Sequence, residues 1–240
     1  MPAVTSVNPS ASVSQDIKGL LYDYKWAVNS FTFSFPTSGS FYTGGSAPNG
    51  EATSNFEALN STQQNYVRNF AFAQFAAVAN VTFSEMTETS SNHADLRLAM
   101  TDATSTAWGY YPWPEAYGGD TWYRNSGGNY DNPVIGNYAA HTFMHEIGHA
   151  MGLVHGHDTS NPFGALPNSH DSVEYSIMTY RSYVGGPTGG GYTYGSASAP
   201  QTLMQNDIAA LQYLYGANYN TNSGNTVYSW DPSTGQTFIN

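Results

Sequence analysis

The sequence predicts an α+β fold, in which helices pack on a β-sheet, and three patterns lead to this class. Residues 31–35 and 94–100 alternate in side-chain character with the period of two that is typical of strands. Segments that begin at Ser61 and at Leu203 repeat apolar residues at helical spacing. A third helix is indicated by a pair of histidines that are four residues apart.

Composition and charge limit the classes of partner. Six Lys and Arg against 17 Asp and Glu give a net charge of −11, too few cations for a basic patch, so we expect neither nucleic acid nor an anionic membrane as a partner. The absence of cysteine excludes thiolate metal sites, cysteine nucleophiles and disulfides. The sequence has no apolar run of about 18 residues, and its N-terminus does not resemble a signal peptide.

The first part of the chain is expected to contain one short helix and one strand. Residues 1–16 have no clear pattern and are predicted to be an irregular arm. Residues 16–26 have the spacing of a short amphipathic helix. The strand at 31–35 ends at Pro36, and a loop rich in Gly, Ser and Asn follows over residues 38–50.

A long helix is predicted to begin at Ser61, because Ser61 and Gln64 can form a capping box. Apolar residues form two adjacent rows along this helix, and so broad an apolar face indicates that the helix packs against a sheet. The two apolar rows of this helix are Tyr66, Phe70, Ala73 and Ala77, and beside them Val67, Ala71 and Val78.

Four further strands are expected, at residues 81–86, 94–100, 107–113 and 121–124. In the second of these, Asp95 and Arg97 would lie on the more polar face. Pro112 and Pro114 bracket Trp113, and proline cannot donate a hydrogen bond to a neighbouring strand. The strand at 107–113 is therefore predicted to lie at the edge of the sheet.

Two helices are predicted in the second half of the chain. The first begins near Tyr138 and ends at Gly152, since glycine readily adopts the left-handed conformation of a helix C-terminus. The second spans about residues 203–215 and ends at Gly216. Residues 217–240 alternate weakly.

The helix that begins near Tyr138 contains the strongest chemical signal of the sequence. Five of the seven histidines fall between residues 141 and 158, including the motif His145-Glu146-x-x-His149. On a helix, His145 and His149 are one turn apart on the same face, so both imidazoles can bind one metal ion. Glu146 would then lie beside the ion, where a general base is needed. We interpret the motif as a catalytic zinc site.

The third ligand is expected to come from beyond the helix. His141 and His149 are eight residues apart, about 12 Å along the helix axis, so both cannot bind the same ion. Once Gly152 turns the chain back, His155 and His157 are the two candidates. His155 fits the extended pattern His-Glu-x-x-His-x-x-Gly-x-x-His and is our predicted ligand.

The remaining histidines receive plainer interpretations. His141 and His157 are expected to pack near the site or to support it. His93 and His170 are expected to be solvated loop residues. Asp158 could either orient an imidazole or stabilise its own loop, and the sequence leaves both open.

At this point the sequence resembles a known family. Met178 follows His155 by 23 residues, in the segment Ser176-Ile177-Met178-Thr179-Tyr180. This arrangement is similar to the metzincin zinc peptidases, in which a methionine turn lies under the metal, and among them to the serralysins, secreted bacterial endopeptidases. The resemblance implies that Met178 forms this turn. It also implies that Tyr180 is an additional zinc ligand that leaves the metal and stabilises the oxyanion when substrate binds.

The resemblance also implies a fold. We expect a metzincin-like zincin fold with a twisted, mostly parallel sheet, an antiparallel edge strand, a long backing helix, an active-site helix and a C-terminal helix. Residues 1–240 would form a single catalytic domain, with an upper part over about 1–152, a lower part over about 153–218 and a tail over 219–240. Such a chain would be a trimmed catalytic domain or a relative without the repeat domain.

The chain departs from the serralysins in two respects. Gly156 stands where these proteins commonly have proline directly after the third histidine. The glycine-aspartate repeats that bind calcium in serralysins do not occur in this sequence. Calcium binding is therefore left open.

The expected function is hydrolysis of peptide bonds by water that zinc activates and Glu146 deprotonates. An extended protein or peptide substrate would add as a strand to the sheet edge. The residues expected to bind it are Ala107, Trp108, Gly109 and Tyr110. By resemblance the protein would be a secreted, extracellular, bacterial monomer without an N-terminal signal peptide.

The alternative function is that of a zinc-stabilised binding module without catalysis, in which Tyr180 closes the site as a fourth ligand. Glu146 argues against it, since a structural site needs no base. A zinc hydrolase acting on something other than peptides is a third, weaker hypothesis.

Overall fold

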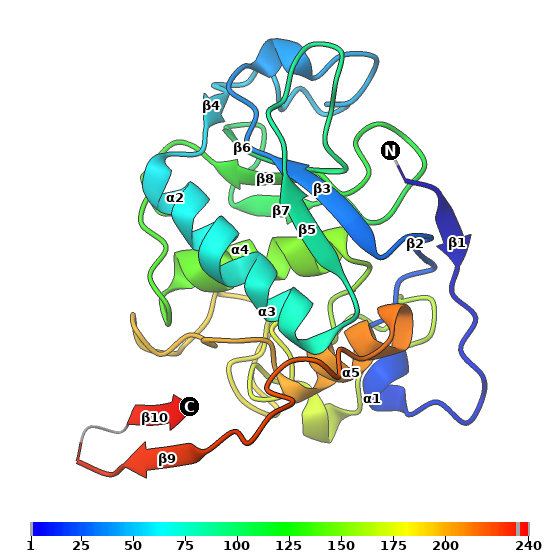
Figure 1. Ribbon diagram of the computed structural model, residues 1–240, viewed down its shortest axis with the longest axis vertical. Helices are drawn as coiled ribbons and strands as arrows, with labels where there is room; N and C mark the ends of the chain where they lie inside the picture. The colour runs from blue at the N-terminus through cyan, green and yellow to red at the C-terminus, as the bar shows by residue number, and fades with distance from the viewer. Residues whose placement is uncertain (1, 234–235, 240) are drawn as a thin grey trace.

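The computed structural model describes residues 2–233 and 236–239 (Figure 1). The strands are β1 (Val4–Ser6), β2 (Tyr24–Trp26), β3 (Ser30–Ser34), β4 (Glu57–Ala58), β5 (Thr82–Glu85), β6 (Leu96–Thr101), β7 (Ala107–Gly109), β8 (Thr121–Arg124), β9 (Tyr228–Asp231) and β10 (Gln236–Ile239). The helices are α1 (Gln15–Lys18), α2 (Ser61–Tyr66), α3 (Phe72–Val78), α4 (Tyr138–Ala150) and α5 (Gln205–Tyr215), with a π-helical turn η2 (Val67–Ala71) between α2 and α3 and 3-10 turns η1 (Gly39–Phe41) and η3 (Asn168–His170).

The central sheet has the strand order β5-β3-β6-β8-β7, and β4 pairs with β6 beside this path. Strands β5, β3, β6 and β8 are parallel, whereas β7 is antiparallel to β8 with Trp108 opposite Trp122. The mostly parallel sheet and its antiparallel edge strand confirm the predicted α+β architecture. The strand containing Ala107 lies at the edge, as predicted, but it ends at Gly109, before both prolines, rather than at residue 113.

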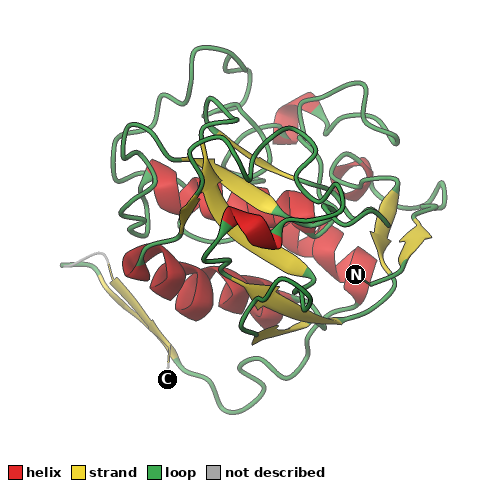
Figure 2. Ribbon diagram, turned by 90° about the horizontal axis from the view of Figure 1, so that it is seen from above, coloured by secondary structure: helices red, strands yellow, loops and turns green. Residues whose placement is uncertain are grey.

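The helices that carry the core and the site share one face of the sheet. Helix α3 packs against β5, α4 packs against β7 and β8, and η2 contacts α4. Aromatic rings fill the space between them: the ring centroids of Tyr123 and Phe143 are 4.0 Å apart, and those of Phe72 and Phe83 are 4.4 Å apart. This layer places α4 directly beneath the edge strand β7 (Figures 1 and 2).

The opposite face of the sheet at β7 and β8 is covered by a loop over residues 39–56. Trp122 is fully buried there, with its ring 4.6 Å from that of Tyr42. Trp108 packs in the same cluster. Because residues alternate between faces along a strand, Trp108 points away from α4, whereas Ala107 and Gly109 face it.

The N-terminal segment differs from its prediction. The helix expected over residues 16–26 ends at Gly19, and the chain then forms β2, which pairs with β1 through Val4 and Trp26. The backbone at Gly19 lies so close to Leu166 that a Cβ atom on residue 19 would be 2.5 Å from the backbone nitrogen of Leu166. Part of the predicted irregular arm therefore forms the strand β1, because β2 follows later in the chain and pairs with it.

The long helix is confirmed in α2, η2 and α3, but its details differ. Its N-cap is Asn60, which forms the capping box with Gln63, one residue before the predicted pair. The π-helical turn inserts an extra residue and rotates the apolar face that follows. Phe72 and Phe75 are buried as a result, whereas Ala73, predicted to be on the apolar row, is exposed.

The polar face predicted for the strand at 94–100 is wrong for Arg97. All six residues of β6 are buried, and Arg97 donates from Nε and Nη2 to the carboxylate of Asp120, at 3.0 and 2.6 Å. Its guanidinium also lies 4.2 Å from the ring centroid of Tyr42. A buried arginine is tolerated because this pairing satisfies its charge.

The C-terminal elements agree with the sequence. Helix α5 ends at Gly216, whose φ is +84°. Strands β9 and β10 pair as an antiparallel hairpin that lies apart from the central sheet in both views. Among the residues that the structure describes, no helix is both long and apolar enough to cross a membrane.

Candidate metal centre

Three histidines converge at the C-terminal end of α4. Their Nε2 atoms are close together: His155 is 3.2 Å from His145 and 3.0 Å from His149. The chain returns at Gly152, whose φ of +92° is the left-handed conformation that favours glycine. Within the described residues, these three form the one group of histidine or acidic side chains placed to share a metal ion.

The backbone orients two of these rings. Nδ1 of His145 is 2.8 Å from the carbonyl oxygen of Ile177, and Nδ1 of His149 is 2.8 Å from that of Leu153. A carbonyl oxygen only accepts, so each Nδ1 carries the proton and each Nε2 presents a lone pair to the centre. Buried lone pairs that face one another at this distance repel unless a cation lies between them, so the donor set fits a metal.

Burial keeps these imidazoles in the neutral form that binds metals. Desolvation lowers the pKa of His149 to about 4 and, with the neighbouring histidines, lowers the pKa of His155 to about 2. The pKa of His145 is also well below the ordinary value, first because of desolvation. At neutral pH all three rings are therefore available as ligands.

Tyr180 lies at the open side of the three histidines. Its hydroxyl is 3.0 Å from Nε2 of His155, and its side chain is partly exposed, so solvent reaches this edge of the site. Met178 lies on the other side, buried beneath α4. Its sulfur is so close to Gly148 that a Cβ there would be 2.6 Å away.

An aspartate of α5 holds the segment that contains Met178. The carboxylate of Asp207 accepts from the Ser176 hydroxyl at 2.6 Å and from the Ile177 N–H at 2.9 Å. Ile177 in turn offers its carbonyl oxygen to His145 and His141. The C-terminal helix thus fixes the position of the turn under the site.

Glu146 lines the pocket beside the histidines together with His145 and Tyr180. Its carboxylate receives a hydrogen bond from the backbone N–H of Gly109 in β7. Desolvation raises the pKa of Glu146 to about 8, against the effect of that hydrogen bond. A cation held by the neighbouring histidines would favour the ionised form.

The histidines excluded from the ligand set contact other groups. His141 is buried, with Nε2 3.0 Å from the carbonyl oxygen of Ile177 and Nδ1 2.9 Å from the hydroxyl of Tyr194. His157 accepts at Nδ1 from the Tyr180 N–H at 3.3 Å, and the two ring centroids are 4.6 Å apart. Both lie next to the site, outside the group of three.

Three polar residues elsewhere acquire partners that the sequence did not indicate. His93 and His170 were expected to be simply solvated, but their Nδ1 atoms lie 2.7 Å from the carboxylates of Glu88 and Asp16. The carboxylate of Asp158 accepts from the hydroxyl and the N–H of Ser160, which supports the loop-stabilising role.

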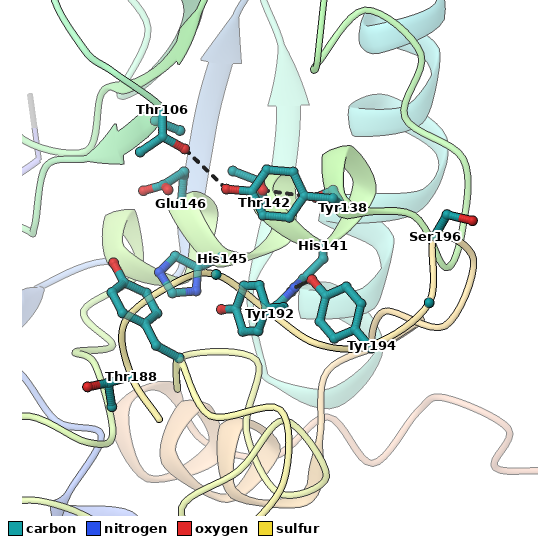
Figure 3. Close-up of a pocket in the computed structure, with 14 residues that line it drawn as sticks. Thr106, Tyr138, His141, Thr142, His145, Glu146, Thr188, Tyr192, Tyr194 and Ser196 are labelled. Carbon is teal, nitrogen blue, oxygen red and sulfur yellow. Dashed lines mark hydrogen bonds between the residues drawn. The ribbon is translucent and has the colours of Figure 1, made fainter. Parts of the chain in front are cut away.

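A pocket of about 550 Å³ adjoins the metal centre (Figure 3). Ala107 of β7 lines it, together with Glu146 and His145 of α4. The other predicted substrate residues lie differently. Gly109 packs on α4, where a Cβ would be 2.4 Å from the Glu146 carbonyl oxygen, and the Tyr110 hydroxyl is bonded to the carboxylate of Glu51 on the far side of the strand.

Comparison with known proteins agrees with this geometry. Residues 56–156 match the reprolysin-like M12B metallo-peptidase family. The chain is 35% identical to serralysin G of Dickeya chrysanthemi over 70% of this chain and 36% of that protein. It is 34% identical to metallopeptidase AprA of Pseudomonas marginalis over 87% of this chain and 44% of that protein. The chain belongs to the serralysin-type metzincins.

This serralysin-type chain spans less than half the length of the relatives it matches. The matched region of the M12B family begins at Phe56, just before β4, and ends at Gly156, so it includes all three histidines and Glu146. Membership of a metallopeptidase family implies a metal, and the donor set described above fits one.

Several residues around the serralysin-type site could not be found from sequence. Thr106, Tyr138, Tyr192 and Tyr194 line the pocket but belong to loops or to a helix start without a motif. The one signal was the alternation of Tyr192 and Tyr194 in a Gly-rich loop. With 19 tyrosines in the chain, such a pattern has little specificity.

Proposed function

We propose that the chain is the catalytic domain of a zinc-dependent endopeptidase, with His145, His149 and His155 as metal ligands. The observation that carries the proposal is the convergence of three Nε2 atoms beside a buried carboxylate at the mouth of a pocket. Three ligands leave a position open for the reaction, as catalytic zinc sites require. The exclusively imidazole donor set suits zinc and excludes the hard oxygen-preferring cations.

Glu146 acts as the general base. A zinc ion at the three histidines supplies a Lewis acid that polarises the scissile carbonyl and makes water more acidic. The Glu146 carboxylate takes the proton of the attacking water and then delivers it to the nitrogen of the leaving amine. The Gly109 N–H holds the carboxylate in place for both transfers.

Tyr180 stabilises the developing oxyanion. Burial raises the pKa of Tyr180 to about 12, so its phenol keeps its proton at neutral pH and can donate it in a hydrogen bond. Its partly exposed position allows the side chain to move, and its contact with His155 supports the role of an additional ligand in the absence of substrate.

The substrate is an extended protein or peptide segment that pairs with the free edge of β7. The Thr106 carbonyl and the Tyr110 N–H are bonded to Arg124 and Asp120 of the neighbouring chain segment. Backbone groups alternate in direction along an antiparallel strand, so those of Ala107 point to the open edge. Ala107 to Tyr110 thus form the proposed binding strand. The side chains of Trp108 and Tyr110 hold this strand in place by packing on the face of the sheet away from α4.

The wider setting follows from the same proposal. By analogy with the serralysins, the protein acts outside the cell, as a monomer and on protein or peptide substrates. Residues 1–240 form one catalytic domain, divided at Gly152 into an upper part and a lower part, with a tail from residue 219. The low cation count argues against nucleic acid and membrane surfaces as partners.

The test is a casein digest with purified protein, with and without a chelator, and with a Glu146→Gln variant. We expect chelation to abolish cleavage and the variant to lose about 10²–10⁴-fold in kcat/KM while it retains its zinc. Glu174→Gln, at an exposed glutamate, is the matched control. Zinc-dependent folding without any cleavage would favour the binding-module alternative instead.

A further inference from the structure

The backbone that carries Tyr180 is held by side chains from two separate loops. The hydroxyl of Tyr192 donates to the Thr179 carbonyl oxygen at 2.9 Å, and Nδ1 of His157 accepts from the Tyr180 N–H at 3.3 Å. This carbonyl and this N–H belong to one peptide group and point in opposite directions. The peptide group is therefore bonded from both sides, and we call His157 and Tyr192 the peptide clamp.

His157 contacts the ring of Tyr180 as well as its backbone. The ring centroid of His157 is 4.6 Å from that of Tyr180 and 5.4 Å from that of His155. A backbone N–H only donates, so Nδ1 of His157 carries no proton and turns its lone pair toward Tyr180. Because His157 lies outside the group of three histidines, these contacts give it a role other than metal binding.

Tyr192 belongs to a loop that follows the site, and it lines the pocket beside His141 (Figure 3). Its ring is stacked on that of Tyr194, with centroids 4.8 Å apart. The Tyr194 hydroxyl is in turn 2.9 Å from Nδ1 of His141 in α4. The Thr193 N–H donates to the hydroxyl oxygen of Ser182 at 2.8 Å. The loop is thus attached both to α4 and to the chain that follows the methionine turn, which fixes the place of the Tyr192 hydroxyl.

The chain on either side of the clamped peptide group is also restrained. Asp171 accepts from the hydroxyl of Thr179 and, at 2.7 Å, from Nε of Arg181. On the preceding side, Asp207 holds the methionine turn, as described above. The backbone of Tyr180 therefore has little freedom, and its phenol changes place by rotation about the side-chain bonds.

We propose that His157 and Tyr192 are positioning residues, which fix the backbone of Tyr180 so that its phenol moves between the metal centre and the oxyanion from one defined point. The proposal rests on the proposed peptidase function, in which Tyr180 stabilises the oxyanion. Each clamp residue acts through Tyr180 rather than on the reacting atoms. A hydrogen-bond donor is effective in catalysis when it is held in advance toward the developing charge, so a looser backbone at Tyr180 lowers turnover.

The first test is the kinetics of the zinc-loaded protein with Tyr192→Phe, which removes the clamp hydroxyl and keeps the ring. We expect kcat to fall about 5- to 10-fold, as for the loss of one hydrogen bond, with little change in KM. Tyr219→Phe, at a strongly exposed tyrosine, is the matched control. In a Tyr180→Phe background the change at Tyr192 should have no further effect, because the phenol through which it acts is absent.

Equal losses of kcat from Tyr192→Phe in the wild-type and Tyr180→Phe backgrounds would overturn the inference and leave the peptidase function intact. A wild-type protein that binds zinc but cuts no peptide would instead refute the proposed function.

His157 is tested by removal and rescue. His157→Ala should lower kcat about 10-fold at unchanged zinc content, whereas His157→Asn returns an acceptor near the place of Nδ1 and should recover most of the loss. His170→Ala, at a histidine that contacts Asp16, is the control and should keep the wild-type kcat. Equal losses in the Ala and Asn variants, or loss of zinc from both, would contradict the positioning role of His157.

A second readout does not depend on turnover. Copper(II) bound in place of zinc gives a visible charge-transfer band when a phenolate is its ligand, and Tyr180→Phe should lack this band. We expect the band to weaken about twofold or more in Tyr192→Phe and in His157→Ala, since loss of the clamp shifts the population toward displaced phenol. A band as strong in both clamp variants as in the wild type would show that Tyr180 is positioned without them.

Discussion

At the scale of single residues, the side chain of Tyr180 is less buried and less restrained by hydrogen bonds than those of His145 and His149. His145 and His149 are buried and tied to backbone carbonyls, whereas Tyr180 is partly exposed and its hydroxyl contacts only the edge of the group, at His155. The two histidines are thus held in place, as permanent metal ligands would need to be, whereas the Tyr180 side chain can change its position and act as a hydrogen-bond donor. This difference gives the proposed roles a physical basis.

Removing the Tyr180 hydroxyl should lower turnover without removing the metal. For Tyr180→Phe we expect a decrease of about 100-fold in kcat with little change in KM, because the phenol would act on the transition state. Zinc content should stay at the wild-type value, since three histidines remain. Steady-state kinetics and metal analysis measure both, with Tyr183→Phe as an exposed control. Wild-type kcat in Tyr180→Phe would rule out the oxyanion role.

Asp207 should make stability depend on pH. Desolvation raises the pKa of Asp207 to about 6, against hydrogen bonds from Ser176, Ile177 and Met204, whereas in the unfolded chain it is about 3.9. Between these values the folded state binds more protons, so this group's contribution to the free energy of unfolding falls as pH rises from about 4 to 6. Two pKa units correspond to about 3 kcal/mol.

Denaturant unfolding of the wild type and of Asp207→Asn over this range isolates that contribution. The stability of the wild type relative to the variant should decrease toward pH 6, since the variant lacks the titrating group. A difference that is independent of pH would show that Asp207 titrates normally.

At the scale of elements, the site depends on the contact between α4 and β7. Gly109 allows the strand to lie directly on the helix, and any side chain there would meet the Glu146 backbone. The contact places the free edge of β7 beside the carboxylate of Glu146, the proposed general base. Edge strands are usually protected from further pairing, and here the unprotected edge supplies the proposed binding strand.

Proline at Ala107 should weaken peptide binding. The change removes the N–H that points to the open edge, and we expect KM for a long peptide to rise about 10-fold with a smaller effect on kcat. Ala107→Ser retains the N–H and serves as the control. Circular dichroism checks that the sheet is retained. An unchanged KM in a folded variant would exclude main-chain pairing at this residue.

At the scale of the whole molecule, the metal should link the upper and lower parts of the chain. His145 and His149 come from α4, whereas His155 follows the reversal at Gly152. Their shared ion would bind only the folded chain and stabilise it by mass action, by about 4 kcal/mol at a thousandfold excess over Kd.

Chelation should therefore lower Tm by about 10 °C, and added zinc should restore it. Calorimetry of the protein with and without chelator measures the shift. His155→Ala should lose most of this response, whereas His170→Ala, at a histidine that contacts Asp16 and lies outside the group of three, should keep it. A response to chelator that His155→Ala retains in full would place the metal elsewhere.

Local patterns in the sequence were sufficient for several features. His145 and His149 fall on one helical face by spacing alone, and Gly152 and Gly216 mark the ends of α4 and α5 because glycine tolerates positive φ. Pro112 and Pro114 predicted the edge strand, since proline lacks a donor. These features depend on residues that are close together in the chain, so they can be predicted without knowledge of the fold.

Other features were decided only when distant segments met. The π-helical turn in the long helix moved Phe72 into the core, and burial turned Arg97 into the partner of Asp120. The pocket beside the histidines combines His141 of α4 with Tyr194 in a loop about fifty residues later, which no local pattern links. Residues that are close together in the chain were therefore enough to predict the metal centre, whereas the pocket beside it could be recognised only in the folded structure, because its lining side chains come from distant parts of the chain.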